Sequence, residues 1–254
     1  MLRVTVIVPT CYRPGLLERA LRSIAAQAVR PAEVIIVDDG EERHGDLVRQ
    51  AVEKCALEHA RVVANAHGKG ISGARNTGAE FGTGELLAFL DDDDEWLPEY
   101  LSEILTRFNS RRLDMVCTDL VYQFDDGTER PGKSAPDRLA SDLFLTRNPG
   151  LIGSNLTIRR SVYRKIGGFD EGLPSSEDMD FGIRVSLVGG VRYEPLHQRL
   201  VRHYQHSGPR LSLPEGEAMR AGVRRFYELH GHRMTAAQRE EFWRVFSRST
   251  PKSL

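Results

Sequence analysis

The stretch LLAFLDDDDEW, from Leu86 to Trp96, decides how the rest of this 254-residue chain is interpreted. An apolar run from Leu86 to Leu90 ends abruptly at four consecutive carboxylates, Asp91 to Asp94. Such a run, bounded by turn-forming residues, predicts a buried strand. Four adjacent like charges repel one another, and Mg²⁺ or Mn²⁺ binds carboxylate oxygens and offsets that repulsion. The alternative is a solvated acidic turn that caps the next helix, and the spacing alone favours neither.

The rest of the first half alternates between strands and helices. Strands are predicted at 4–8, 34–37, 61–64 and 85–90, and helices at 14–27, 46–59 and 98–108. The glycine-rich turn at 67–73 is predicted to open a further short helix that runs through Phe81. This alternation predicts an α/β fold with a mostly parallel sheet and helices on both faces. In such sheets, ligands bind beyond the carboxyl ends of the strands. We therefore expect Cys11, Asp38-Asp39 and Asp91 to Asp94 to gather at one edge of the sheet.

The regular alternation ends near residue 110. Strands are predicted at 114–118, 155–158 and 200–205, and helices at 161–166, 179–188, 215–230 and 236–246. Asp125-Asp126-Gly127 predicts a hairpin turn, and Ser176 predicts an N-cap for the helix at 179–188. We interpret residues 1–213 as one domain with two halves, 1–110 and 111–213, followed by a helical extension over 214–254.

Composition excludes several classes of protein. The formal net charge is −1, which argues against a general nucleic-acid binder. The three cysteines are far apart and form no metal-binding pattern, as expected for reduced thiols in the cytoplasm. No run approaches the roughly 18 apolar residues of a membrane span, and the N-terminal run is too short for a signal peptide. We expect a cytoplasmic protein that is soluble, or peripheral at the inner face of the membrane.

Two polar segments in the first half are candidates for nucleotide binding. A carboxylate at a strand end, such as Asp38 or Asp39, can accept a hydrogen bond from N3 of uracil; the alternative is a turn-forming aspartate before Gly40. The glycine-rich segment from His67 to Gly73 opens a helix whose first N–H groups can face an anion, and Arg75 can add a bond to phosphate. The segment is neither a P-loop nor a GxGxxG fingerprint.

Ser176-Glu177-Asp178 is the candidate for acid–base chemistry. A carboxylate there is either a complement to the helix dipole or a general base that takes a proton from a hydroxyl nucleophile. His203 and His206 fall on the last predicted strand and the turn after it. Histidine at such positions can bind metal or donate to phosphate, although a structural or exposed role is more common.

Six short segments follow one another in a specific order. They are VTVIVPT (4–10), VIIVDDG (34–40), GISGARNTG (70–78), AFLDDDDEWLP (88–98), IGGFDE (166–171) and SEDMDFGIRV (176–185). Over residues 3–207 this series resembles the inverting family 2 glycosyltransferases of the GT-A fold. The resemblance implies a Rossmann-like catalytic domain over 1–213, with a nucleotide-binding half and an acceptor half. It also implies transfer of a sugar from a nucleoside-diphosphate sugar to an acceptor hydroxyl, with a UDP-sugar as the expected donor. The transfer would serve polysaccharide, glycolipid or other glycoconjugate synthesis.

The resemblance implies a role for each matched carboxylate. Asp178 would be the catalytic base. Asp93 would bind the metal, Mn²⁺ or Mg²⁺, with Asp91 as a further candidate, and Asp91 and Asp92 would lie toward the nucleotide. His206 falls near a histidine that many members carry after the last strand, which makes it another candidate metal ligand.

Other matched positions would bind the nucleotide. Asp38 and Asp39 would face the base, and Arg75 would lie near the nucleotide or its diphosphate. Pro9 and Cys11, at the end of the first strand, would also contact the nucleotide. The family often carries an aromatic residue that stacks on the base at the position of Cys11, so this contact departs from the family pattern.

Three other kinds of protein compete with this interpretation. A phosphatase of the haloacid dehalogenase type needs Thr or Val two residues after its second aspartate, where this chain has Glu95. A sugar nucleotidyltransferase needs a glycine-rich basic loop after its first strand, and PTCYRPG is not one. A catalytically silent nucleotide-binding or scaffold protein of the same fold remains, although Asp91, Asp93 and Asp178 are all present.

The segment from Pro214 onward carries more basic than acidic residues and two apolar stripes. One stripe contains Phe226 and the other contains Phe242. Packing onto the catalytic domain, a homodimer contact, and docking on an anionic membrane that carries a lipid-linked acceptor are the three alternatives. A glycan, a lipid-linked molecule or a small molecule is the expected acceptor.

Overall fold

The chain folds as an α/β protein whose first half alternates strand and helix. In order, the elements of that half are β1 (Val4–Thr10), α1 (Pro14–Ala25), β2 (Glu33–Asp38), α2 (Gly45–Lys54), β3 (Ala60–Ala64), α3 (Ile71–Phe81), β4 (Leu86–Phe89), β5 (Glu95–Trp96) and α4 (Tyr100–Ser110). The second half continues with β6 (Met115–Phe124), β7 (Glu129–Pro131), η2 (Ser141–Phe144), η3 (Gly153–Asn155), β8 (Leu156–Arg159), α5 (Arg160–Lys165), α6 (Glu177–Leu187), β9 (Tyr193–Gln205), α7 (Glu217–His230), η4 (Gly231–Arg233) and α8 (Ala236–Phe246). The computed structural model describes residues 2–11, 13–40, 45–205 and 216–247.

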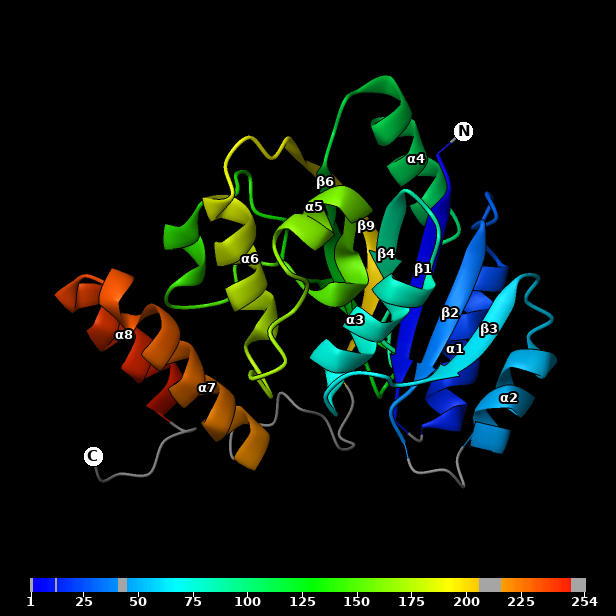
Figure 1. Cartoon of the computed structure of the whole chain (residues 1–254), viewed down its shortest axis with the longest axis horizontal. Coiled ribbons are helices and arrows are strands. Elements are labelled where there is room, and N and C mark those ends of the chain that lie inside the picture. The colour runs from blue at the N-terminus through cyan, green and yellow to red at the C-terminus, as the bar shows by residue number, and fades with distance from the viewer. Residues whose placement is uncertain (1, 12, 41–44, 206–215, 248–254) are drawn as a thin grey trace.

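One mixed sheet of nine strands connects both halves in the described part of the chain (Figure 1). Its order is β3-β2-β1-β4-β8-β6-β9-β5, with β7 paired to β6. The four strands β3, β2, β1 and β4 are parallel, as the alternation of strands and helices predicts. β8 is antiparallel to both β4 and β6, whereas β6 and β9 are parallel. The sheet therefore changes from parallel to mixed where the second half begins.

Two apolar clusters cover the two faces of the sheet. Val6 and Val8 of β1 belong to the cluster that includes α1, α2 and α4, whereas Ile7 belongs to the cluster on the other face. This division follows from the alternation of side chains along a strand. The second cluster includes residues of α3, α6, α7 and α8, among them the buried Phe226 and Phe242. The prediction of helices on both faces is therefore confirmed.

Helix α7 packs beside α6, and α8 packs on α7, where the rings of Phe226 and Phe242 lie 5.8 Å apart. Val223 and Phe226 of α7 are completely buried, and Nε2 of His230 lies 2.9 Å from Oδ1 of Asp180 in α6. Gly222 allows close approach, because a Cβ atom there would come 2.1 Å from the Ser175 hydroxyl oxygen. None of the helices in the described ranges combines the length and apolarity needed to span a membrane.

Several predicted element bounds are wrong. The predicted helix at 46–59 ends at Lys54, because Ala56 and His59 have φ values of 47° and 57°, outside the helical region. Strand β6 runs on to Phe124, and β9 begins at Tyr193, because the two pair over ten residues of each strand. Ser176 does precede α6, but it adopts a left-handed conformation and its side chain accepts no capping bond from the described residues.

Candidate active site

The candidate site begins where β1, β2 and β4 end. The backbone N–H of Asp39 donates to the carbonyl oxygen of Thr10 at 2.9 Å, and that of Leu90 donates to Ile7 at 3.0 Å. These bonds bring the residues after the three strands to one edge of the sheet. The gathering predicted for Cys11, Asp38-Asp39 and Asp91 to Asp94 is therefore observed.

Asp92 and Asp93 share one arginine. Asp92 is completely buried and accepts a hydrogen bond from the Thr10 hydroxyl at 2.6 Å. Nη2 of Arg13 pairs with Asp92, and Nη1 of the same guanidinium lies 2.7 Å from Oδ2 of Asp93. Burial raises the pKa of Asp92 to about 7, although Arg13 and Thr10 oppose that shift. Arg13 thus holds the middle of the acidic run against the end of β1.

Asp94 turns in the opposite direction, toward β9. Its carboxylate accepts a hydrogen bond from the Ser154 hydroxyl at 2.5 Å and from the backbone N–H of Tyr204 at 3.1 Å. Nδ1 of His203 lies 3.0 Å from the same carboxylate. Burial disfavours a charge on His203, but Asp94 outweighs that effect and raises the pKa of the imidazole to about 9. His203 is therefore a cation at neutral pH.

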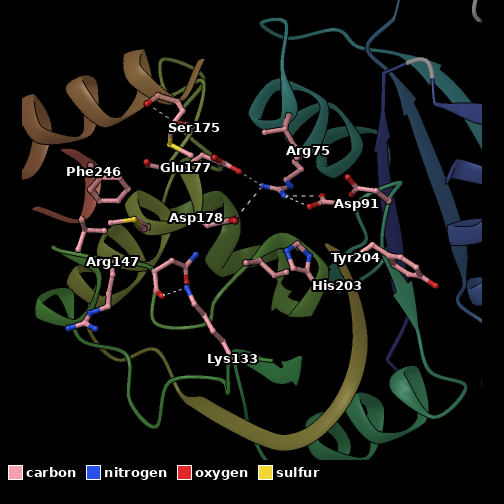
Figure 2. A pocket seen from close by; sticks show the side chains of 18 of the residues that line it. Arg75, Asp91, Lys133, Arg147, Ser175, Glu177, Asp178, His203, Tyr204 and Phe246 are labelled. Carbon is pink, nitrogen blue, oxygen red and sulfur yellow. Dashed lines mark hydrogen bonds and ion pairs between the residues drawn. The ribbon is translucent and has the colours of Figure 1, made fainter. Parts of the chain in front are cut away.

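Arg75 connects the acidic run to α6. Its side chain is completely buried, and Nη2 lies 2.9 Å and 3.1 Å from the two carboxylate oxygens of Asp91. Nη1 lies 3.2 Å from Glu177 and 3.3 Å from Asp178. Burial lowers the pKa of Arg75, but the nearby carboxylates more than reverse this effect, so the guanidinium stays charged. Figure 2 shows Arg75 between Asp91 on one side and Glu177 on the other.

Asp178 has the electrostatic character of a proton acceptor. Burial raises its pKa well above 3.8, the negative charge of Glu177 raises it further, and Arg75 opposes both. A single guanidinium cannot neutralise three carboxylates, so Asp178 retains its proton to a higher pH than a free aspartate does. A carboxylate whose pKa lies closer to neutrality is a more effective general base.

These residues surround a cavity of about 440 Å³ (Figure 2). One end is lined by Arg13, Arg75, Asp91, Asp93, Glu177, Asp178, His203 and Tyr204. The remaining wall comes from Ile71, Lys133, Arg147, Asn148, Ile152, Ser175, Ser176, Met179, Met219, Val245 and Phe246. The C-terminal helices therefore supply part of the cavity wall through Met219, Val245 and Phe246.

The residues predicted to bind the base lie outside this lining. Asp38 accepts a hydrogen bond from the backbone N–H of Gly40 at 2.9 Å, which is the turn alternative. Asp39 accepts one bond from the Asn65 side chain at 2.6 Å and another from the Gly70 backbone at 2.8 Å. Asp39 thus positions the glycine-rich segment. These two bonds fix the orientation of its carboxylate, and both of its oxygen atoms already accept a hydrogen bond from the protein.

Pro9 and Cys11 flank the end of β1. Pro9 is buried within the strand, opposite Val37 of β2. Cys11 is exposed, and its Sγ lies 3.9 Å from the carbonyl oxygen of Asp39. His206 lies outside the described residues.

The sequence patterns predict no role for Arg13 and no specific role for His203, and they include Glu177 only as a neighbour of Asp178. The need for positive charge beside four aspartates points to Arg13, which follows directly on β1. His203 could be found from the alternation along β9, since it lies two residues before the strand ends. The sequence carries no local signal for Lys133 and Arg147, because tertiary folding brings them to the cavity.

Asp91 and Asp93 are the candidate ligands for a divalent metal at the cavity edge. The described residues contain no group of three or more His, Cys, Asp or Glu side chains placed to hold an ion. Asp93 and Asp91 line the cavity, and Mg²⁺ is commonly held by one or two carboxylates together with substrate phosphates. Two carboxylates at a cavity edge fit that kind of site, in which phosphate oxygens supply the remaining ligands.

Known proteins resemble this chain in both sequence and fold. One relative is a Haemophilus influenzae protein described as an uncharacterized glycosyltransferase. It is 28% identical over 194 residues, which cover 72% of this chain and 61% of that protein. The pre-mycofactocin glycosyltransferase of Mycobacterium tuberculosis is 30% identical over 209 residues, which cover 79% of this chain and 42% of that protein. The chain thus spans 42% to 61% of the length of these relatives.

A solved structure shares the fold. S. aureus TarS 1-349, crystallised in complex with UDP-GlcNAc, superposes with a TM-score of 0.69 at 22% identity and covers 97% of this chain and 72% of that one. The sequence pattern of Glycosyl transferase family 2 matches residues 5–167, a span that contains Arg75 and the whole acidic run. That span is more than half of the chain, and it includes β2 to β8 and all of β1 except its first residue, with the strand ends that form the site. The chain therefore belongs to glycosyl transferase family 2.

Proposed function

We propose that the protein is a metal-dependent inverting glycosyltransferase, which moves a sugar from a nucleoside-diphosphate sugar to an acceptor hydroxyl. The observation that carries the proposal is the placement of Asp178, a carboxylate with a raised pKa and a side chain only 15% exposed, in one cavity with Asp91 and Asp93. A proton acceptor and a donor-binding edge within one cavity are what a single displacement at the anomeric carbon requires.

The named relatives support the donor class. TarS 1-349 has been crystallised with UDP-GlcNAc and also with UDP. A Campylobacter jejuni relative, 35% identical over 109 residues, carries the name GalNAc(5)-diNAcBac-PP-undecaprenol beta-1,3-glucosyltransferase. On this basis we propose a UDP-sugar as the donor. The acceptor is a hydroxyl-bearing glycan, lipid-linked molecule or small molecule.

The charges of the site support a role for a divalent metal. The carboxylates of Asp91 to Asp94, Glu177 and Asp178 outnumber Arg13, Arg75 and His203, the cationic side chains described above as their partners. A diphosphate would add further negative charge. Asp93 would hold Mn²⁺ or Mg²⁺, with Asp91 beside it. When bound, the ion stabilises the charge that develops on the leaving diphosphate.

The chain's own residues carry the rest of the mechanism. Arg75 holds the Asp178 carboxylate in place and keeps Asp91 at the opposite end of the same guanidinium. Asp178 accepts the proton of the acceptor hydroxyl as the oxygen attacks. Attack from the face opposite the leaving group inverts the anomeric configuration. The cationic His203 contributes positive charge near the donor edge.

The decisive experiment combines ligand binding with turnover. Nucleoside diphosphates are screened by thermal shift with and without Mn²⁺, and UDP-sugar hydrolysis is then measured without acceptor. We expect UDP to raise the melting temperature more with Mn²⁺, and we expect slow release of UDP from a UDP-sugar. If the chain binds UDP but neither hydrolyses nor transfers any UDP-sugar, it is a silent nucleotide-binding protein, and the proposal is wrong.

A further inference from the structure

The cavity extends away from the acidic edge, and its far end has a different chemistry. Val245 and Phe246 of α8 line the cavity there, together with Lys133 and with Arg147, which pairs with Glu241 of the same helix. Figure 2 shows the Asp178 side chain between Asp91 on one side and Arg147 and Phe246 on the other. An acceptor hydroxyl that gives its proton to Asp178 approaches from the side away from Asp91. The remainder of that acceptor must then lie along this far wall.

The two cations lie close enough to influence each other. Lys133 donates one hydrogen bond from Nζ to the carbonyl oxygen of Asn148 at 2.9 Å. Loss of surrounding water lowers the pKa of Lys133, and the positive charge of Arg147 lowers it further. An anion between the two groups would relieve this repulsion. An ammonium group has three donors and a guanidinium has five, so both retain capacity for such an anion.

Arg147 already contacts α8. Its Nη2 lies 2.8 Å from Oε1 of Glu241, with the arginine side chain 66% exposed. An ion pair at this exposure contributes little to stability. The contact instead orients the guanidinium, whose other N–H groups can bind a phosphate or carboxylate in a fork.

The apolar wall next to these cations is well anchored. The ring of Phe246 lies 4.8 Å from the ring of Phe242, which is completely buried. Val245 is 44% exposed, an unusual value for a large apolar side chain in this molecule, and it lines the cavity. When a ligand covers exposed apolar groups of this kind, their removal from water favours binding.

We propose that this far end binds an acceptor with an anionic group, phosphate or carboxylate, next to an apolar portion. Lys133 and Arg147 would bind the anion, and Val245 and Phe246 would cover the apolar portion. The inference rests on the proposed glycosyl transfer, because that function makes the far end the acceptor side. It narrows the acceptor from any hydroxyl compound to an anionic amphiphile.

Binding of simple probes tests the proposal without knowledge of the true acceptor. Octyl phosphate, octanoate, octyl β-glucoside and inorganic phosphate are titrated into the full chain by calorimetry, below their micelle concentrations. We expect octyl phosphate or octanoate to bind at least about tenfold more tightly than octyl β-glucoside or inorganic phosphate. The tighter of the two anions identifies the headgroup. Equal affinity for octyl β-glucoside would overturn the proposal.

Matched variants separate anion binding from an architectural role of Arg147. Arg147→Gln and Lys133→Gln should each weaken the anionic probe about tenfold. Glu241→Gln breaks the same contact with α8 but keeps the cation, so its affinity for the probe should be unchanged or higher. If Glu241→Gln weakens the probe as much as Arg147→Gln does, Arg147 only anchors α8. Thermal unfolding of each variant verifies that it is folded.

Parallel titration of the natural chain with UDP and Mn²⁺ keeps the two proposals apart. A chain that binds UDP but does not prefer anionic amphiphiles would contradict this inference alone. A chain that prefers anionic amphiphiles but does not bind UDP would contradict the proposed function. The far end would then still be a binding site for an anionic amphiphile.

Discussion

Nη2 of the buried Arg75 lies within 3.1 Å of both carboxylate oxygens of Asp91, while Nη1 of the same guanidinium reaches Asp178. One side chain therefore sets the separation between the end of β4 and the beginning of α6. Any change that moves this guanidinium moves both carboxylates relative to each other. The guanidinium keeps its position only because Gly153, which packs against it, has no side chain.

Gly153→Ala should displace Arg75 without changing any charge. A Cβ atom at Gly153 would come 2.3 Å from Nη2 of Arg75, closer than real contacts allow. We expect a loss of about 1–3 kcal/mol in the free energy of unfolding, measured by urea denaturation, together with a loss of activity. Gly15→Ala in α1 is the matched control, because nothing lies within 4 Å of its added Cβ. If both variants match the natural chain, the packing of Arg75 against Gly153 is not tight.

Asp178→Asn should remove catalysis but preserve nucleotide binding. The amide keeps the shape and a hydrogen bond to solvent or substrate, but it cannot accept the acceptor's proton. We expect kcat to fall by about 10²- to 10⁴-fold, with UDP affinity changed by less than a few fold. Glu177→Gln is the comparison, since Glu177 contacts the same Nη1 of Arg75. An Asp178→Asn variant that turns over at the natural rate would remove Asp178 from its role.

Asp178 should also shape the pH dependence. If ionised Asp178 is the base, kcat/KM should rise with pH through an apparent pKa above 3.8. Stability should change in the opposite direction. Because the folded protein holds this proton to higher pH than the unfolded chain, the contribution of Asp178 to the free energy of unfolding falls as pH rises from 3.8 through the raised pKa.

The pH effect on stability has a direct control. The difference in unfolding free energy between Asp178→Asn and the natural chain should shift in favour of the variant as pH rises, measured by urea denaturation between about pH 5 and 8. A difference that is constant over this range would show that the pKa of Asp178 is not raised in the folded protein.

Asp93→Ala should weaken binding of UDP only when metal is present. Calorimetry with Mn²⁺ should show a loss of about tenfold or more, while the weak binding measured in EDTA should change little. Asp142→Ala, an exposed aspartate paired with Arg138, controls for general charge effects. Equal Mn²⁺-dependent affinities for Asp93→Ala and the natural chain would refute the metal assignment.

Asp39→Ala tests recognition of the base. If its carboxylate accepts the N3–H group of uracil, UDP affinity should fall by about 1.5–3 kcal/mol. Asp39 also holds Asn65 and Gly70, so a disturbed loop is the rival explanation. Pyrophosphate separates the two, since loss of base recognition leaves its affinity unchanged and a disturbed loop lowers it together with that of UDP.

The parallel half of the fold and its ligand edge could be predicted because their signals are local. Each strand of that half is a short apolar run, and Asp38-Asp39 and Asp91 to Asp94 follow directly on two of them. The extent of β9 could not be predicted, since its first residues owe their strand conformation to pairing with β6, about 80 positions earlier. Polar residues such as Glu194 give no strand signal of their own.

The ion pairs within the site could not be predicted from the sequence either, because their partners lie far apart along the chain. The pairing of Arg13 with Asp92 spans 79 positions, and that of Arg75 with Asp178 spans 103. The sequence pattern predicts a positive partner for the acidic run, and a divalent metal is the partner that it indicates. The structure adds Arg13, Arg75 and His203 as partners provided by the protein itself.

The close approach of Gly222 to Ser175 limits how this chain can be recombined with its relatives. The α7 backbone rests on the loop that leads into Glu177 and Asp178, and the fit depends on a missing side chain at one position and a small one at the other. A chimera whose α7 carries any larger side chain at the position of Gly222 would therefore place a clash at Ser175, in the segment that leads to Asp178. Such a graft should succeed only when the segment before α6 is exchanged together with the helices.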